Sequence, residues 1–353
     1  MRIGLIGVGR IGVLHAATLR ALPDVEALFV ADADVALARS AADRLVPDHD
    51  QPAPGGSSPP KPVIAAGTVA ELFATKPDGV VIAAATPAHG PLVRLAADAG
   101  VPTFCEKPLA PDVEGTRAIL TQVAAAGIPL QMGFQRRFDA GYLAARSALN
   151  AGDLGRLHLV LACTLDPAPP HESYIPDSGG IFADCSVHDI DAVRWATGRE
   201  VVEVRATGAN KGADFFASAG DVDTASAVLT LDDGTLVLMA ASRYNGAGYD
   251  VRLELHGSRA TVVAGLDDQA PLASAEPDVA WPGEPAYANF AARFRSAYIA
   301  ELRAFLDVAA GAVASPCPGE EALNALYVAK ACELSRGEGR AVRVEEIVTE
   351  PAT

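Results

Sequence analysis

Short apolar runs alternate with amphipathic helical segments over the first part of the chain. The run at 3–6 is followed by a glycine turn and by a helical period that begins at about residue 10. A second run, VEALFVAD, leads to a helical segment at about 34–45. The alternation continues, with strands expected near 62–66, 79–85, 101–106 and 129–134 and helices near 68–75, 89–99 and 112–126. This order predicts an α/β, Rossmann-type domain over residues 1–134, built on a doubly wound parallel sheet.

The pattern changes after residue 134. A helix at about 139–151 precedes the strand LHLVLACTLD, and another helix is expected over GGIFADCSVHDIDAVRW. Further strands are expected near 200–209, 222–232, 235–243, 249–256 and 259–264, with the hairpin signals LDDGT and HGSR between them. Two helices, at about 287–311 and 319–336, and a final strand AVRVEEI complete the pattern. We therefore expect an α+β domain over residues 135–353 with an open, mainly antiparallel sheet.

One segment, PDHDQPAPGGSSPPKP at 47–62, has no apolar period and is expected to be a loop. It joins a helix to the following strand, which places it at the amino-terminal edge of the parallel sheet. Ligands bind at the opposite, carboxyl-terminal edge of such sheets. We therefore expect this segment to take no part in the chemistry.

The strand at 222–232 is apolar or small on both of its faces. The alternating residues are Ala225, Ala227, Leu229 and Leu231 on one face and Thr224, Ser226, Val228 and Thr230 on the other. Only one face can pack on the core of its own domain. The second face therefore predicts contact with another subunit, in a homo-oligomer.

The composition narrows the class of partner. The 353 residues include 28 Lys and Arg against 44 Asp and Glu, a net charge of −16, which argues against a nucleic acid or an anionic membrane. The sequence has no apolar run of roughly eighteen residues and no signal-peptide pattern. The five cysteines are scattered without a CxxC pair, so neither a disulfide framework nor a structural zinc site is indicated. We expect a cytoplasmic protein that binds a small molecule.

The turn after the first strand carries Gly7, Gly9 and Gly12 in a GxGxxG pattern. This pattern is weak alone, but the second strand ends at Asp32, twenty residues beyond Gly12, which is the spacing of an acid that binds an adenosine ribose. The glycines let backbone N–H groups and a helix N-terminus approach a pyrophosphate. A carboxylate at Asp32 accepts the ribose hydroxyls and repels a 2′-phosphate, so NAD is the expected cofactor. The alternative is a tight turn that binds no ligand.

Two strand ends at the same edge carry polar side chains. Thr86 and His89 follow the fourth strand, and Lys107 follows the fifth, where Pro108 favours an extended backbone that directs the amine toward the nicotinamide. The alternative for Lys107 is a solvated loop cation. The alternative for His89 is a residue of a helix N-terminus.

The segment GGIFADCSVHDID at 179–191 gathers acids and a histidine in an apolar stretch. At helical pitch Asp184, His188 and Asp191 are expected on one stripe. A neutral His188 can accept a hydroxyl proton, and Asp184 can orient the imidazole or bind substrate. The stripe could also hold a divalent ion, but without a further His or Cys cluster nearby no metal is predicted. The remaining alternative is a structural helix with acids near its N-terminus and a packed histidine.

These motifs, with EKP at 106–108 and FQRRFD at 134–139, resemble the glucose-fructose oxidoreductase/inositol dehydrogenase/MocA family over essentially the whole chain. EKP and the GGxxxDxxxHxxD stretch are far more specific than the glycines. Within the family, FQRRFDAGY, GGIFADCSVHDIDAVRW and GYDVRLELHGS are most similar to myo-inositol 2-dehydrogenases and related cyclitol dehydrogenases.

The resemblance implies hydride transfer between a nicotinamide cofactor and a ring polyol, with a homotetramer as the assembly. The implied catalytic residues are Lys107, which binds the reacting oxygen, and the proton-handling pair Asp184 and His188. The residues expected to bind the cofactor are Gly7, Gly9, Arg10, Ile11, Gly12, Asp32, Thr86, His89, Glu106 and Lys107. The residues expected to bind the substrate are Gln135, Arg136, Asp166, Asp184, His188 and Tyr244. Variation at Gln135 and Cys185 among relatives leaves the identity of the polyol open.

Three functions of different classes fit these observations. We favour NAD-dependent oxidation of a secondary hydroxyl of a cyclitol or sugar to a ketone. A second is a hidden-redox enzyme, such as a glycosidase or epimerase, that retains its NAD and returns the hydride. A third is a regulator that binds NAD without catalysis, against which the presence of Lys107 and His188 argues.

Overall fold

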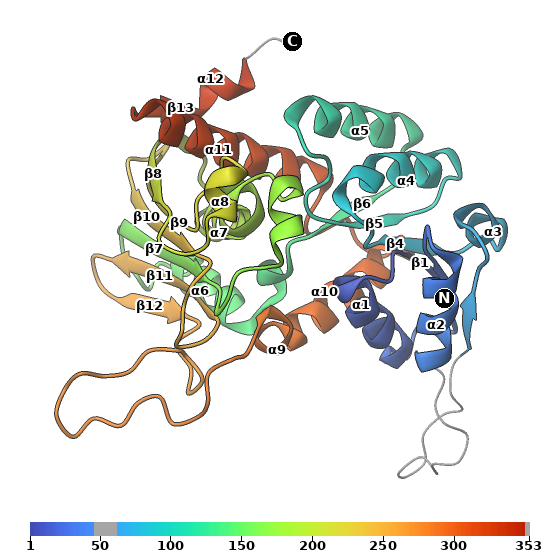
Figure 1. The fold of residues 1–353 in the computed structure, drawn as a ribbon, viewed down its shortest axis with the longest axis horizontal. Helices are drawn as coiled ribbons and strands as arrows, with labels where there is room; N and C mark the ends of the chain where they lie inside the picture. Colours follow the sequence, from blue (N-terminus) through green and yellow to red (C-terminus); the bar gives the residue numbers. More distant parts are fainter. Residues whose placement is uncertain (46–61, 350–353) are drawn as a thin grey trace. The chain divides into compact units, whose positions relative to one another are not determined.

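The computed structural model describes residues 1–45 and 62–349, which form two compact units (Figure 1). The first unit comprises Met1–Phe134 and Tyr298–Leu323, and the second comprises Gln135–Ala297 and Asn324–Thr353. The expected loop at 47–62 lies outside the described residues except for Pro62. None of the described helices is both long and apolar enough to cross a membrane.

The first unit is built on a six-stranded parallel sheet in the order β3-β2-β1-β4-β5-β6. Its strands are β1 (Arg2–Ile6), β2 (Ala27–Ala31), β3 (Val63–Ala65), β4 (Gly79–Ile82), β5 (Thr103–Glu106) and β6 (Leu130–Gly133). Its helices include α1 (Arg10–Ala21), α2 (Val35–Leu45), α3 (Val69–Ala74), α4 (Thr86–Asp98) and α5 (Val113–Ala126). The central strands are apolar and buried, as parallel strands covered by helices require. The predicted doubly wound sheet is confirmed.

Helix α10 (Arg295–Ala309) contributes to the core of the first unit. Phe305 is fully buried there, and its ring lies 5.8 Å from the ring of Phe104 in an edge-to-face arrangement. Gly79 leaves room for this ring, because a Cβ at that position would lie 3.1 Å from Phe305. The sequence pattern assigned every residue after 134 to the second domain. The segment 298–323 belongs instead to the first unit, because the apolar side chains of α10 are buried in its core.

The second unit is built on a seven-stranded sheet in the order β12-β11-β7-β10-β9-β8-β13. Its strands are β7 (Leu157–Leu165), β8 (Val201–Ala209), β9 (Thr224–Leu231), β10 (Leu236–Ser242), β11 (Asp250–Gly257), β12 (Thr261–Ala264) and β13 (Val342–Arg343). The pair β7 and β10 is parallel, and the other pairs are antiparallel. The predicted open, mainly antiparallel sheet is confirmed.

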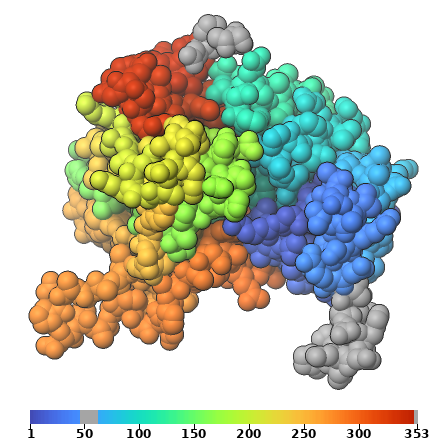
Figure 2. All heavy atoms as spheres, in the orientation of Figure 1, coloured from blue at the N-terminus to red at the C-terminus, as the bar shows by residue number. Residues whose placement is uncertain are grey.

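Helices of the second unit pack on one face of this sheet, where α6 and α7 contact its strands. The short helical segments are η1 (Gln135–Phe138), η2 (Glu172–Asp177), the π-helical η3 (Phe182–Ser186), α8 (Phe215–Ser218), α9 (Phe290–Arg293) and α12 (Val344–Val348). The longer helices are α6 (Ala140–Asn150), α7 (Val187–Thr197) and α11 (Gly319–Glu338), of which α11 begins in the first unit. The connection between β12 and α9, drawn in orange, protrudes from the surface of this unit (Figure 2).

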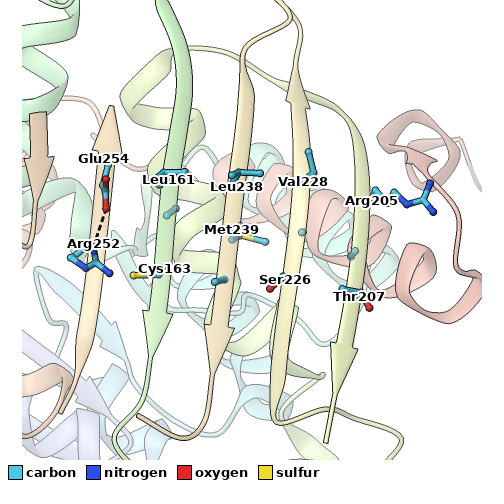
Figure 3. A pocket seen from close by; sticks show the side chains of 14 residues that line it. Leu161, Cys163, Arg205, Thr207, Ser226, Val228, Leu238, Met239, Arg252 and Glu254 are labelled. Carbon is cyan, nitrogen blue, oxygen red and sulfur yellow. Dashed lines mark hydrogen bonds and ion pairs between the residues drawn. The ribbon is translucent and has the colours of Figure 1, made fainter. Parts of the chain in front are cut away.

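The other face of the sheet carries a hollow of about 580 Å³ (Figure 3). Leu161, Val228 and Leu238 point into it from neighbouring strands, and Arg252 pairs with Glu254 at one side. Exposed fractions of 41% for Val228 and 44% for Leu238 are large for apolar side chains in the middle of strands. This surface, the outer sheet face, is the second face that the alternation along 222–232 predicted.

The expected final strand AVRVEEI is only partly a strand. Val342 and Arg343 pair with β8, and the chain then turns into helix α12. The carboxylate of Glu346 accepts a hydrogen bond from the backbone N–H of Arg343 at 2.8 Å, as a capping residue does at a helix start. Local capping therefore overrides the alternating pattern.

The packing of α10 predicts that Phe305→Ala destabilises the first unit. Deleting a buried aromatic ring costs about 3–5 kcal/mol, because the cavity only partly collapses. Amide exchange in β1, β4 and β5 should accelerate accordingly. The control is Arg303→Ala, an exposed position on the same helix, which should leave exchange unchanged. If exchange accelerated in the second unit alone, the assignment of 298–323 to the first unit would be wrong.

Candidate functional site

Two of the three glycines in the turn of the first unit, Gly7 and Gly12, have no room for a side chain. Gly7 has a φ of +97°, and a Cβ there would lie 2.5 Å from the backbone N of Ala84. A Cβ on Gly12 would lie 2.0 Å from the carbonyl oxygen of Gly7. Gly9 is exposed at the N-terminus of α1, and no side chain lies within 4 Å of the position of its Cβ. Arg10 and Ile11 follow in the first turn of that helix.

Asp32 lies beside this turn. One of its carboxylate oxygens accepts the backbone N–H of Val8 at 2.8 Å, and the other accepts that of Asp34 at 3.0 Å. The carboxylate is thereby fixed at the end of β2, and each oxygen retains a second lone pair. A helix N-terminus, a glycine turn and a fixed carboxylate fit the pyrophosphate and adenosine ribose of a dinucleotide.

His89 is buried in α4, and both of its ring nitrogens lie close to backbone carbonyl oxygens. Its Nδ1 lies 2.7 Å from the carbonyl oxygen of Pro108, and its Nε2 lies 2.9 Å from that of Ala84. These contacts tie the start of α4 to the turn that carries Lys107, which is half-buried and precedes a cis peptide bond to Pro108. Thr86 is half-buried as the first residue of α4.

Glu106 at the end of β5 is held by a residue that sequence reasoning missed. Its Oε1 lies 2.6 Å from Nε2 of His15, which is fully buried in α1. Ala16 and Leu19 lie on the same buried face of that helix. A histidine on the apolar face of an amphipathic helix is a signal for a buried polar partner, and it could have identified this pair.

The segment 179–191 is not one continuous α-helix. Gly179 and Gly180 have positive φ angles, η3 follows as a π-helical turn, and α7 begins at Val187. Wider turns of this kind, with i to i+5 bonds, shift the register of side chains and are frequent at functional sites. The expectation of a single α-helical stripe was therefore wrong.

The acids of this segment have different partners. Asp191 is buried and bound by the guanidinium of Arg137, with Nε to Oδ2 at 2.9 Å. Asp189 is buried and bound by Arg136 and by the hydroxyl of Thr164 at 2.6 Å. Burial raises the pKa of Asp189, and the bonds from Arg136 and Thr164 act against that rise.

This pairing disfavours the metal alternative, because Asp191 is held by an arginine. Among residues 1–45 and 62–349, no group of three or more His, Cys, Asp or Glu side chains is placed to hold a metal ion. Arg136 is 1% exposed, and its guanidinium contacts Asp189 and Thr164. Its position favours a supporting role over direct contact with a substrate.

Asp184 belongs to a separate cluster. Its Oδ1 accepts the hydroxyl of Tyr174 at 2.9 Å, and its Oδ2 accepts Nη2 of Arg243 at 2.7 Å. The Nη1 of Arg243 lies 3.3 Å from Asp166, and the Cys185 thiol lies 3.6 Å from the same carboxylate. We call these five side chains the Arg243 cluster.

The sheet explains why Asp166 and Arg243 meet. Strands β7 and β10 are parallel with Leu165 opposite Ser242, so the next residue of each leaves the sheet at the same edge. Backbone bonds continue the pairing, with Asp166 N–H to Ser242 at 2.8 Å and Asn245 N–H to Asp166 at 2.7 Å. Burial raises the pKa of Asp166, and the nearby guanidinium of Arg243 acts against this rise. An arginine directly after a buried strand was the signal for this residue, but its partners depend on a parallel pairing that the sequence pattern did not specify.

The remaining predicted substrate residues lie in the same unit. Gln135 is 4% exposed in η1. Tyr244 is 41% exposed, its hydroxyl accepts the backbone N–H of Ala213 at 3.1 Å, and its ring lies 6.4 Å from that of Phe216. The structure thus gathers Asp166, Asp184 and Tyr244 near the carboxyl end of β10, and His188 follows in the first turn of α7.

Family models match both units. A model described as an oxidoreductase family with an NAD-binding Rossmann fold matches residues 1–134. A model described as the GFO/IDH/MocA C-terminal domain matches residues 142–263.

Relatives align over nearly the whole chain. Myo-inositol dehydrogenase Hyg17 from Streptomyces leeuwenhoekii is 38% identical, with 96% of this chain and 98% of the relative covered. The crystal structure of a myo-inositol dehydrogenase from Corynebacterium glutamicum is 32% identical with a TM-score of 0.85, covering 100% of this chain and 99% of that one. The crystal structure of scyllo-inositol dehydrogenase from Lactobacillus casei, with bound NAD(H) and scyllo-inositol, is 25% identical with a TM-score of 0.82, covering 98% and 99%. The chain therefore belongs to the GFO/IDH/MocA family of oxidoreductases.

Proposed function

We propose that this protein oxidises a secondary hydroxyl of a cyclitol to a ketone with NAD. The similarity to inositol dehydrogenases over both units carries the proposal, because it covers the glycine turn as well as the Arg243 cluster. The turn at Gly7 and Gly12 and the carboxylate of Asp32 fit the cofactor. When bound, NAD⁺ supplies the acceptor for the hydride.

The proposed chemistry assigns one role to each of three residues. His188 accepts the hydroxyl proton at a ring nitrogen, which requires its neutral form. Asp184 keeps a negative charge one turn earlier and favours the imidazolium that forms. Lys107 places an ammonium beside the developing alkoxide, where scarce water strengthens the interaction.

We propose that Gln135, Asp166 and Tyr244 contact the substrate. A carboxylate and a phenol can each bind ring hydroxyls, which suits a polyol. Arg136 supports this surface through Asp189 and Thr164, since its guanidinium is buried against them.

A screen of myo-inositol, scyllo-inositol, aminocyclitols and hexoses for NADH formation tests the function. Net reduction of added NAD⁺ with a cyclitol supports it. Nucleotide that stays bound through purification, with no net NADH formed from any of these compounds, would favour the hidden-redox alternative. Nucleotide binding without turnover of any substrate would favour a regulator.

His188→Ala should lower kcat with an accepted cyclitol by about 100-fold or more, because the general base is lost. The rate of the unmodified protein should rise with pH as the His188 imidazolium loses its proton, and this rise should disappear in the variant. Affinity for NAD should change little, since the glycine turn lies in the first unit. The control is His158→Ala, an exposed histidine on β7. Retained activity with an unchanged pH profile would show that His188 is structural.

Asp32 should set the preference for NAD over NADP. A 2′-phosphate beside its carboxylate meets like-charge repulsion, so discrimination in kcat/KM should exceed about tenfold, or roughly 1.4 kcal/mol. Asp32→Ala should reduce that ratio, and Asp34→Ala, at the next acid along the chain, should not. Equal efficiency of the unmodified protein with both cofactors would contradict this assignment.

We further propose a cytoplasmic homotetramer in which the outer sheet face meets a second copy of the chain. Val228, Leu236 and Leu238 are each more than 40% exposed on adjacent strands. Their contiguity favours burial in an interface. The described cysteines include all five of the sequence and form no disulfide, which suits a reducing compartment.

Leu238→Arg should dissociate the assembly, because an unpaired charge would be buried at the centre of the interface. Sedimentation at micromolar concentration should give a fourfold mass for the unmodified protein and a smaller mass for the variant. Leu37→Arg is the matched control, since Leu37 is 52% exposed on α2 of the first unit. A single-chain mass for the unmodified protein would refute the assembly.

A further inference from the structure

Arg243 joins two carboxylates that come from different parts of the second unit. Its side chain is 4% exposed and lies 3.3 Å from Asp166 and 2.7 Å from Asp184. Asp166 is fixed by the register of β7 and β10 and by the backbone bond from Asn245. Asp184 lies in the π-helical turn η3. The guanidinium therefore connects an element of regular structure to one with irregular hydrogen bonding.

The charges of the cluster make this connection strong. Burial alone lowers the pKa of Arg243, but Cys185, Asp184 and Asp166 more than offset it and keep the guanidinium charged. A planar guanidinium can bind two carboxylates at once through separate N–H groups, which a lysine ammonium does with less geometric control. The shared cation weakens the negative electrostatic potential around both carboxylates, Asp166 and Asp184.

Asp184 has a donor on each oxygen. Arg243 binds Oδ2, and the Tyr174 hydroxyl binds Oδ1. Donors to the charged form of a carboxylate favour that form, so these bonds favour an anionic Asp184. A carboxylate held in this state stabilises a protonated histidine and does not itself take up the proton, as in other acid–histidine pairs.

We propose that Arg243 is a positioning residue for the reaction, which holds Asp184 as a fixed anion one turn before His188 and ties it to Asp166. The expected effect of Arg243 on turnover rests on the proposed function. The position and charge of Asp184 are properties of the second unit alone. The titratable groups that interact with Arg243 and Asp184 include Asp166, Cys185 and Tyr174.

The test compares Arg243→Gln, Arg243→Lys and Arg243→Ala with the unmodified protein. Arg243→Gln should lower kcat by about 10- to 100-fold with NAD affinity unchanged, comparable to the loss when a hydrogen-bond partner of a metal-binding side chain is removed. Removing the cation raises the pKa of the nearby imidazolium, so the pH profile of kcat/KM should shift to higher pH. Arg243→Lys should restore part of kcat, and millimolar guanidinium should partly rescue Arg243→Ala. Arg199→Gln, at an arginine with 51% side-chain exposure, is the control.

A second readout needs no turnover. The titration of His188, followed by NMR of labelled histidine and assigned with His188→Gln, should move to higher pH in Arg243→Gln. If the unmodified protein oxidised no cyclitol but this shift occurred, the proposed function would fail and the role of Arg243 would stand.

Three results would overturn the proposal. The first is a kcat of Arg243→Gln within about threefold of the unmodified value. The second is a His188 titration that does not move, and the third is equal activity of the Lys and Gln variants. If Arg243→Gln did not fold, Tyr174→Phe would decide, because Tyr174 is 44% exposed and donates to the same carboxylate. That variant should shift the His188 titration in the same direction by a smaller amount, and no shift would refute the role of the held anion.

Discussion

A buried guanidinium is stable only where a carboxylate balances its charge, and the second unit contains several such ion pairs. Arg136, Arg137 and Arg243 are each less than about a tenth exposed, and each contacts at least one acid. Breaking such a pair leaves an uncompensated charge in the interior, which costs about 3–5 kcal/mol. The segments that carry these residues are therefore held in one arrangement. That arrangement places the acids of the segment 179–191 with little freedom.

Three acids of that segment are distinguished by their partners. The side chains of Asp189 and Asp191 are each 1% exposed. Arg136 binds Asp189 and Arg137 binds Asp191, so the charges of these two acids support the fold. Asp184 has 12% side-chain exposure and is bound by an arginine at a sheet edge and by an exposed tyrosine. Exposure decides which acid can meet a ligand, because only Asp184 retains contact with solvent. The π-helical turn before α7 contributes to this difference by changing the register between Asp184 and the acids that follow.

The sequence pattern predicted both sheets and most of their strands, because period-2 runs and the α/β alternation are local signals. It also indicated the glycine turn, whose crowding at Gly7 and Gly12 is a property of the backbone. Local signals of this kind do not predict which side chains from distant segments of the chain pair with each other. His15 meets Glu106 across 91 residues, and Arg243 meets Asp184 across 59. The place of 298–323 in the first unit was missed for the same reason, since an apolar helix face does not specify which core receives it.

The Arg243 cluster shows how sheet topology produces a site in this protein. One parallel pair in a sheet whose other pairs are antiparallel brings the ends of β7 and β10 to the same edge. An antiparallel pairing would send Asp166 and Arg243 to opposite edges, and their ion pair could not form. The outer sheet face is formed by the same sheet, because alternate residues of β9 and β10 point away from the helices. The strand bodies thus supply an apolar surface suited to self-association, while the ends of β7 and β10 supply charged groups suited to a polar ligand.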